Sequence, residues 1–175
     1  MSAEIIVPFI ECPHRVNNPK VTRDLLVLSS QIVTVPIWAF NSGETGDLNV
    51  VLPAIPPEIH ATTPNAKIRI LWGTALADTT NSVTWFVKLY SFLWDDATYT
   101  LDPVSGDFSG ANGLNSFVTD ISLGAGKPNR CELAIPNAMA VANRGIIGLI
   151  TRNDGSDPLT GKVGLIRALF VADKA

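Results

Sequence analysis

Apolar residues in this chain fall into short runs separated by islands of Asp, Asn, Gly, Ser and Pro. The clearest unit lies near the end, where GIIGLITR and KVGLIRALFV flank the turn NDGSDPLTG, a pattern typical of a β-hairpin. Similar apolar runs recur upstream, at 25–40, 48–52, 67–72, 82–92, 115–123 and 131–135. Many short strands with regular turn signals predict an all-β fold, and we interpret it as an antiparallel, jelly-roll-like β-sandwich.

The first 24 residues differ from the rest. Pro8, Pro13 and Pro19 interrupt them, and neither strand nor helix periodicity persists. We therefore divide the chain into an extended N-terminal arm, 1–24, and a β-sandwich domain, 25–175. Two interpretations of the arm stay open: it adds a strand to the sheet edge, or it attaches to a neighbouring subunit. Its apolar anchor would consist of Ile5, Ile6, Val7, Phe9 and Ile10.

Two of the runs are apolar on both faces. In 82–92 one face carries Val83, Trp85, Val87 and Leu89, and the other carries Phe86, Tyr90 and Phe92. The run 162–171 has the same two-sided character. Because a sheet in a monomer normally exposes one face to water, this pattern predicts a subunit contact, and we expect a homotrimer. The residues expected at that interface are Phe86, Tyr90, Phe92, Ile166 and Phe170.

The amino-acid composition excludes some classes of binding partner. The 175 residues are 46% hydrophobic and only 17% charged, against about 25% charged in an average globular chain. The net charge is −3 without any cluster of Lys and Arg, so we expect no nucleic-acid partner. No apolar run is long enough to span a membrane, and Glu4 stands where a secretion signal would be basic. We therefore expect neither a membrane partner nor self-directed secretion.

The sequence offers few groups for catalysis. Its two histidines, His14 and His60, have no recognisable partner at a meaningful spacing, and Cys12 and Cys131 form no C-x-x-C motif. These observations predict a protein that is not an enzyme, with no cofactor and no metal site. A pair of glycosidase carboxylates is the one arrangement that the sequence leaves open.

Carboxylates are concentrated between Lys88 and Lys127, where no basic residue occurs. Loops rich in oxygen ligands suit a hard cation such as calcium, yet the spacing does not fit a known calcium loop, so we favour simple solvation. The carboxylates concerned are Asp95, Asp96, Asp102, Asp107 and Asp120. Asp154 and Asp157 lie in a later turn and are explained by turn chemistry.

Trp94 is the tryptophan placed most like a binding-site residue. It follows a predicted strand and precedes Asp95 and Asp96, whereas the other three tryptophans, Trp38, Trp72 and Trp85, lie within strand runs and are expected in the core. An exposed indole at a strand end suits a sugar ring, so a carbohydrate-binding module is one interpretation of the chain.

The pattern as a whole resembles the jelly-roll-like β-sandwich proteins on the virion surface of tailed bacteriophages, such as head decoration proteins and head fibre domains. The resemblance rests on VTWFV at 83–87, the DD pair that follows it, FVTDI at 117–121, and the hairpin at 145–171. It covers residues 30–172 and leaves the arm outside.

This resemblance implies a structural virion protein, a capsid decoration or head-surface protein made in the host cytoplasm and attached to the capsid exterior. Its partners would be further copies of itself and the major capsid protein or another virion protein. The negative charge agrees with an outer position away from the genome. The alternatives are a minor capsid or tail protein of the same fold, a carbohydrate-binding module, and an enzyme on a sandwich scaffold.

Overall fold

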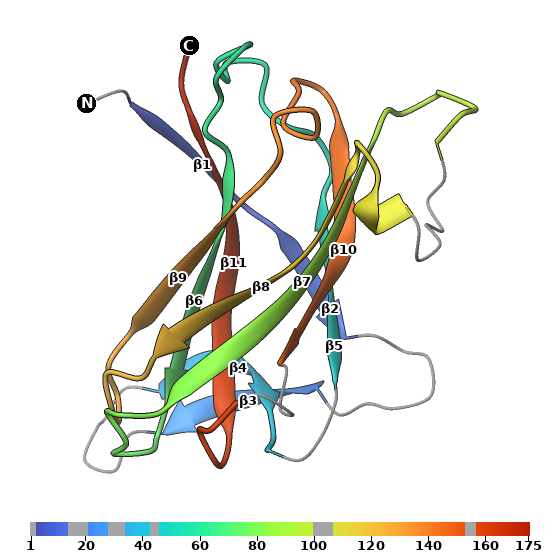
Figure 1. Ribbon diagram of the computed structural model, residues 1–175. Helices are drawn as coiled ribbons and strands as arrows, with labels where there is room; N and C mark the ends of the chain where they lie inside the picture. Colours follow the sequence, from blue (N-terminus) through green and yellow to red (C-terminus); the bar gives the residue numbers. More distant parts are fainter. Residues whose placement is uncertain (1–2, 14–20, 28–33, 43–45, 100–106, 153–156) are drawn as a thin grey trace.

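A computed structural model describes residues 3–13, 21–27, 34–42, 46–99, 107–152 and 157–175 (Figure 1). Among them are eleven strands and one short 3-10 turn. These elements are β1 (Glu4–Pro8), β2 (Ile10–Pro13), β3 (Val21–Val27), β4 (Thr34–Phe40), β5 (Asp47–Leu52), β6 (Lys67–Thr74), β7 (Ser82–Phe92), η1 (Asp107–Ser109), β8 (Gly113–Ile121), β9 (Asn129–Ala134), β10 (Gly145–Arg152) and β11 (Val163–Asp173).

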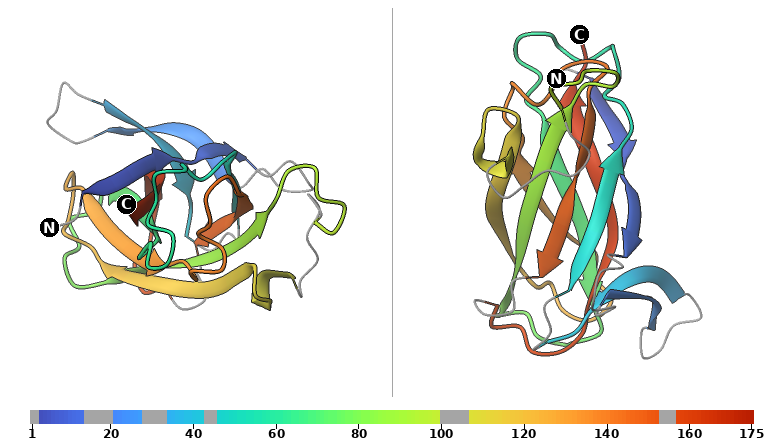
Figure 2. Two further views of the ribbon diagram at one scale, coloured as in Figure 1. Left: turned by 90° about the horizontal axis from the view of Figure 1, so that it is seen from above. Right: turned by 90° about the vertical axis from the view of Figure 1, so that its right-hand side faces the viewer.

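The strands form two antiparallel sheets packed face to face, so the predicted all-β sandwich is confirmed (Figure 2). The first sheet has the order β3-β4-β11-β6-β9, with β1 also paired to β11, and the second has the order β2-β5-β10-β7-β8. No helix in the described part of the chain has the length and apolar character needed to cross a membrane.

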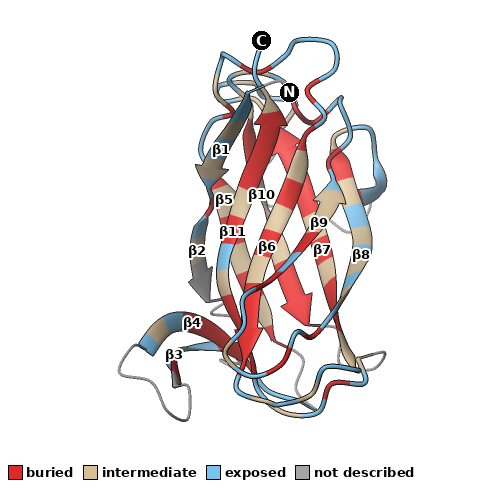
Figure 3. Ribbon diagram, turned by 90° about the vertical axis from the view of Figure 1, so that its left-hand side faces the viewer, coloured by how far each residue is buried: buried red, intermediate tan, exposed pale blue. Residues whose placement is uncertain are grey.

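The core lies between the sheets and is built by alternation. In β7, the predicted inner residues Val83, Trp85, Val87 and Leu89 are all fully buried (Figure 3). In β6, Trp72 is buried and meets Trp85 edge to face, with ring centroids 6.4 Å apart. Burying such aromatic side chains is the main stabilising contribution to a sandwich of this size.

The outer face of the first sheet is charged. Lys67 and Arg69 of β6 alternate with buried Ile68 and Ile70, and pair with Glu132 of β9 at 2.8 Å and 2.6 Å. Glu4 of β1 also approaches Arg69, at 3.4 Å. This sheet therefore presents a solvated face, unlike the outer face of the second sheet.

A β-bulge in β11 shows that part of the predicted subunit interface is wrong. The register of β11 against β6 shifts between Leu165 and Arg167, so the residues on either side of the shift no longer alternate as one series. Phe170, expected at a subunit contact, is consequently fully buried in the core. Ile166 lies at the bulge and is half-buried, packed against a small cluster that contains Ile37.

The other three predicted interface residues lie on the outer side of β7, as expected from the alternation. Tyr90 and Phe92 are nevertheless covered within the chain, because they form an apolar cluster with Phe108 of η1. Phe86 remains half-exposed. The homotrimer stays a prediction, and of its expected contact residues Phe86 is the one that this outer sheet face leaves accessible.

The described N-terminal residues belong to the sandwich. β1 pairs with β11 in the first sheet and β2 pairs with β5 in the second, so the chain crosses between the layers at Phe9. Phe9 is 1% exposed in the core, whereas Ile6 and Ile10 are 50% and 58% exposed. Strand addition thus accounts for 4–13; residues 14–20 lie outside the described residues, and subunit attachment stays a prediction.

Glu11 stabilises the point where the chain passes from the first sheet to the second. Its half-buried carboxylate in β2 accepts hydrogen bonds from the backbone N–H of Ala168 in β11, at 2.5 Å, and from Trp38 Nε1 in β4, at 3.0 Å. Burial raises the pKa of Glu11 above its ordinary value of 4.5, although these hydrogen bonds and nearby arginines oppose the shift. One side chain therefore ties the second sheet to two strands of the first.

Glu11 should make stability depend on pH. A raised folded-state pKa means that the folded protein holds this proton more tightly than the unfolded chain does. The resulting stabilisation is complete below pH 4.5 and is lost as the pH rises through the raised pKa. Denaturant unfolding at several pH values should show the wild type losing stability relative to a Glu11→Gln variant from pH 4 to pH 7. A difference between the two that does not vary with pH would contradict the assignment.

A buried ion pair stabilises the sandwich where β10 ends. Arg152 at the end of β10 donates from Nε to Asp157 at 2.7 Å, and both side chains are fully buried. Its other nitrogens donate to the backbone carbonyls of Phe40, Leu159 and Gly161. The Arg152 guanidinium therefore joins the β10–β11 connection to the end of β4.

Replacing Arg152 by Ala should destabilise the protein strongly. The change leaves the Asp157 carboxylate buried without its partner and removes the donor to three carbonyls, at a cost of about 3–5 kcal/mol in the free energy of unfolding. Lys162→Ala is the matched control, because it breaks the solvent-exposed ion pair to Asp24 and should change the stability little. Similar unfolding midpoints for the two variants would show that the Arg152 pair is not structural.

Candidate functional site

The candidate site is a turn at one end of the sandwich, where loops between strands meet. β7 ends at Phe92, and the chain reverses at Trp94 and Asp95 before it leaves the described residues after Tyr99. Asp95 takes the left-handed conformation, with φ of 64°, which Asp tolerates better than most residues. We call residues 93–99 the Trp94 loop.

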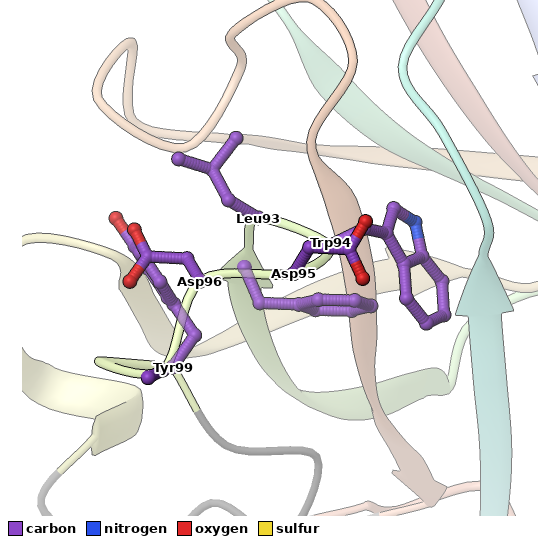
Figure 4. A pocket seen from close by; sticks show the side chains of 7 residues that line it. Leu93, Trp94, Asp95, Asp96 and Tyr99 are labelled. Atoms are coloured by element: carbon purple, nitrogen blue, oxygen red, sulfur yellow. The ribbon is translucent and has the colours of Figure 1, made fainter.

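Trp94 is exposed and yet held in place. Its side chain is 52% exposed, while its indole Nε1 donates a 2.7 Å hydrogen bond to the carbonyl of Pro53. Its ring meets Phe92 edge to face, with centroids 4.8 Å apart and planes at 80° (Figure 4). An aromatic surface fixed at two points loses little conformational freedom when a ligand covers it.

The two carboxylates of the loop differ in their surroundings. Asp95 is exposed beside Trp94, whereas Asp96 turns toward Tyr99 (Figure 4). Asp96 accepts hydrogen bonds from the Thr98 hydroxyl at 2.7 Å and the Thr98 N–H at 2.9 Å. These bonds, with a smaller contribution from the Arg144 charge, lower the pKa of Asp96, so it stays ionised at neutral pH.

A shallow pocket of about 310 Å³ lies along this loop, lined among others by Phe92, Trp94, Asp95, Asp96 and Tyr99. Its volume is at the lower end of the range for small-ligand sites. Apolar ring surface and carboxylate oxygens both face it (Figure 4). This combination suits a ligand that has an apolar face and hydroxyl donors at its edge.

Arg144 holds Tyr99, one of the residues that line the pocket, in place. It donates to Tyr99 Oη at 3.1 Å and to Asn112 Oδ1 at 2.8 Å, and its guanidinium carbon lies 5.5 Å from the centre of the Tyr99 ring. Its Nε is buried and has no hydrogen-bond partner among the described residues. The β9–β10 connection thus holds the Trp94 loop against the start of β8.

The other described carboxylate candidates do not line this pocket. Asp120 accepts a 2.8 Å hydrogen bond from Trp72 Nε1, and burial raises its pKa. Asp107 begins η1, and Asp157 pairs with Arg152. Asp102 and Asp154 lie outside the described residues. Within the described ranges, no group of three or more His, Cys, Asp or Glu side chains could hold a metal ion.

The remaining chemical candidates have local roles. His60 Nδ1 accepts a 3.2 Å hydrogen bond from the Thr63 N–H within its own loop, and His14 lies outside the described residues. Cys131 is a buried free thiol whose pKa burial raises to about 12, so it stays protonated and unreactive at neutral pH.

Tyr99 and Arg144 are the site residues that sequence reasoning missed. They are 45 positions apart, and neither belongs to a motif. The turn-rich composition of both connections could have suggested that they meet at one end of a sandwich, but not that these two side chains touch.

Comparison with known proteins adds little beyond the fold. No protein-family model and no curated protein matches the chain. Among solved structures, TmCBM61, a carbohydrate-binding module in complex with β-1,4-galactotriose, is 10% identical with a TM-score of 0.39, and the match covers 95% of this chain and 89% of that one.

Two further structures resemble the chain over part of their length. The enzymatically active domain of tailspike protein 4 from bacteriophage CBA120 is 10% identical with a TM-score of 0.38, over 95% of this chain and 19% of that one. The glycoside hydrolase domain of Endo-D from Streptococcus pneumoniae R6 is 9% identical with a TM-score of 0.36, over 93% and 21%. The chain thus spans about a fifth of each of these two proteins.

These neighbours contradict the prediction that the chain is not an enzyme, because two of them are enzyme domains. The prediction relied on the small number of histidines and nucleophiles, whereas glycoside hydrolysis needs only two carboxylates, which this sequence has in excess. We withdraw it. At these TM-scores the likeness assigns no reaction and no ligand to this chain.

The neighbours include a phage tailspike domain and a carbohydrate-binding module, so they are compatible with a phage-surface or a carbohydrate-binding role. The resemblance to phage surface proteins is supported as far as the β-sandwich. Capsid decoration is a finer assignment that they do not confirm.

Proposed function

We propose that this protein binds a neutral glycan at the Trp94 loop. The observation that carries the proposal is the half-exposed indole of Trp94, held by the hydrogen bond to Pro53 and by the Phe92 ring beneath it. A large aromatic side chain kept exposed and rigid at the end of a sandwich is placed for contact with a ligand.

A sugar ring matches the chemistry around this indole. The C–H face of a pyranose can cover the apolar indole surface, while its hydroxyl groups donate to carboxylate oxygens at the rim. Asp95 beside Trp94 and Asp96 beside Tyr99 supply such acceptors. The contact surface is formed before the ligand arrives, which lowers the entropic cost of binding.

The charge of the loop selects against acidic sugars. Asp96 is ionised at neutral pH because its pKa is lowered, and Asp95 lies next to it. A uronic or sialic acid carboxylate stacked on Trp94 would meet negative charge at short range, whereas a neutral sugar would not.

Titration calorimetry with neutral oligosaccharides tests this proposal. Soluble cello-, galacto-, xylo-, manno- and chito-oligosaccharides should include at least one that binds the wild-type protein. Trp94→Ala should weaken that binding by at least about tenfold, or ~1.4 kcal/mol, because it removes the stacking surface.

Phe117→Ala is the matched control, since Phe117 is an aromatic side chain of equal exposure on the strand β8, away from the loop. Soluble ligands are monovalent, so any change in self-association leaves the measured site affinity unaffected. The proposal fails if no member of the series binds, or if Trp94→Ala and Phe117→Ala bind equally well.

Attachment to a virion surface is a second candidate, favoured by the apolar side chains that the N-terminal strands leave uncovered. Ile6 and Ile10 are at least half exposed, although their strands are paired within the sandwich. Exposed isoleucines four positions apart on successive strands suit a contact with another protein, here the major capsid protein or another virion protein. In this role the protein would lie on the capsid exterior as a decoration or head-surface protein.

Binding to purified phage particles tests this second candidate. The wild type should co-sediment with the particles, and an Ile6→Asp/Ile10→Asp double variant should not, because each change buries a charge in the contact. Leu25→Asp is the control, an equally exposed apolar residue on β3. Equal co-sedimentation of the double variant and the control would exclude this attachment surface.

A further inference from the structure

β8 is the least protected edge of the sandwich. It is a nine-residue strand at the end of its sheet, with no Lys, Arg or Pro (Figure 3). The other edge strands carry features that discourage pairing: charged side chains in β3 and β9, and short strands ending in proline in β1 and β2. Within the described residues no strand pairs with the outer edge of β8, so its backbone groups beyond Gly113 can accept another strand.

On the outer side of β8, exposed apolar side chains alternate with the polar Asn115 and Thr119. Phe117 and Ile121 are 53% and 59% exposed, and Leu123 just beyond the strand is 53% exposed. Phe117 stacks on Phe86 of β7, with ring centroids 4.5 Å apart, so its ring is supported within its own sheet. These side chains lie beside the open edge and would be covered by any strand added there.

The one charged residue of β8 is turned away from this surface. Asp120 points toward the core side and accepts the hydrogen bond from Trp72 Nε1. Two copies of β8 can therefore approach without like charges facing each other, which is the usual barrier to pairing identical strands.

We propose that β8 pairs antiparallel with β8 of a second copy, with the two-fold axis at Phe117. This alignment pairs the segment 114–120 with its own copy. It sets Phe117 opposite itself, Asn115 opposite Thr119, and Leu114 opposite Asp120, while Gly113 already donates its N–H to the carbonyl of Gly110 at 3.0 Å. A two-fold contact is self-complementary, as pairing of one strand with its own copy requires. The second sheets of the two copies then form one continuous sheet.

A second copy fits this edge better than an unrelated peptide for a specific reason. Aromatic pairs are favourable across antiparallel strands, and the two-fold alignment produces one from Phe117 and its own copy. The resulting dimer differs from the trimer expected from the sequence, and sedimentation separates the two.

Sedimentation velocity on the full chain tests the proposal. The wild type should form a dimer at high micromolar concentration, and Phe117→Lys should raise the dissociation constant at least about tenfold, because two lysines would face each other. Leu25→Lys is the matched control, with an equally exposed leucine on β3, and it should dimerise like the wild type. A monomeric or trimeric wild type, or a Phe117→Lys variant that dimerises normally, would overturn the proposal.

Oxidative cross-linking tests the alignment. Phe117→Cys should give a covalent dimer beyond the wild-type background, because directly opposite residues lie within disulfide reach. Asn115→Cys should not, because its counterpart would be four residues away along the strand, at about 14 Å. A dimer that Phe117→Cys fails to link would mean that another surface or register is used, which contradicts the proposal.

Discussion

The bulge in β11 is the constraint on which the arrangement of the first sheet depends. Before the shift at Leu165, β11 pairs with β4; after it, the same edge pairs with β1. One strand thus serves two partners, and the chain can continue from β1 into β2 of the other sheet. The N–H of Ala168, just past the shift, is satisfied by the Glu11 carboxylate from that other sheet. The two sheets are therefore joined at the point where the pairing of β11 with β6 is irregular.

The same irregularity explains how far the sequence predicts this fold. The runs of apolar residues, the alternation in β7, and the sandwich itself are local or statistical properties of the chain, and they were predicted correctly. The bulge is not visible in the pattern KVGLIRALFV, and one extra residue is enough to move Phe170 from an outer face into the core. A simple alternation rule fails at the strand where the ladder is interrupted.

The candidate site was predictable in the same uneven way. Trp94, Asp95 and Asp96 are neighbours along the chain, so their grouping could be seen before the structure. Arg144 comes from a different connection, and its contact with Tyr99 depends on how the two loops close over the end of the sandwich. Likewise, Asp157 was explained by turn chemistry alone, whereas its buried pairing with Arg152 requires the β10–β11 connection to fold back. Residues that are neighbours in the sequence could be grouped in advance, whereas contacts between residues of separate connections could not be predicted.

The hydrogen bond from Trp94 to Pro53 determines which part of the indole can contact a ligand. Because its single N–H is already used within the protein, the ring offers a ligand only its flat carbon surface. Such a surface distinguishes sugars by the stereochemistry of their carbons: a pyranose face whose hydroxyls are equatorial lies flat against it, whereas an axial hydroxyl on that face holds the ring away. In a glycan bound as proposed, Trp94 would thus distinguish epimers by how closely the sugar face packs on the indole.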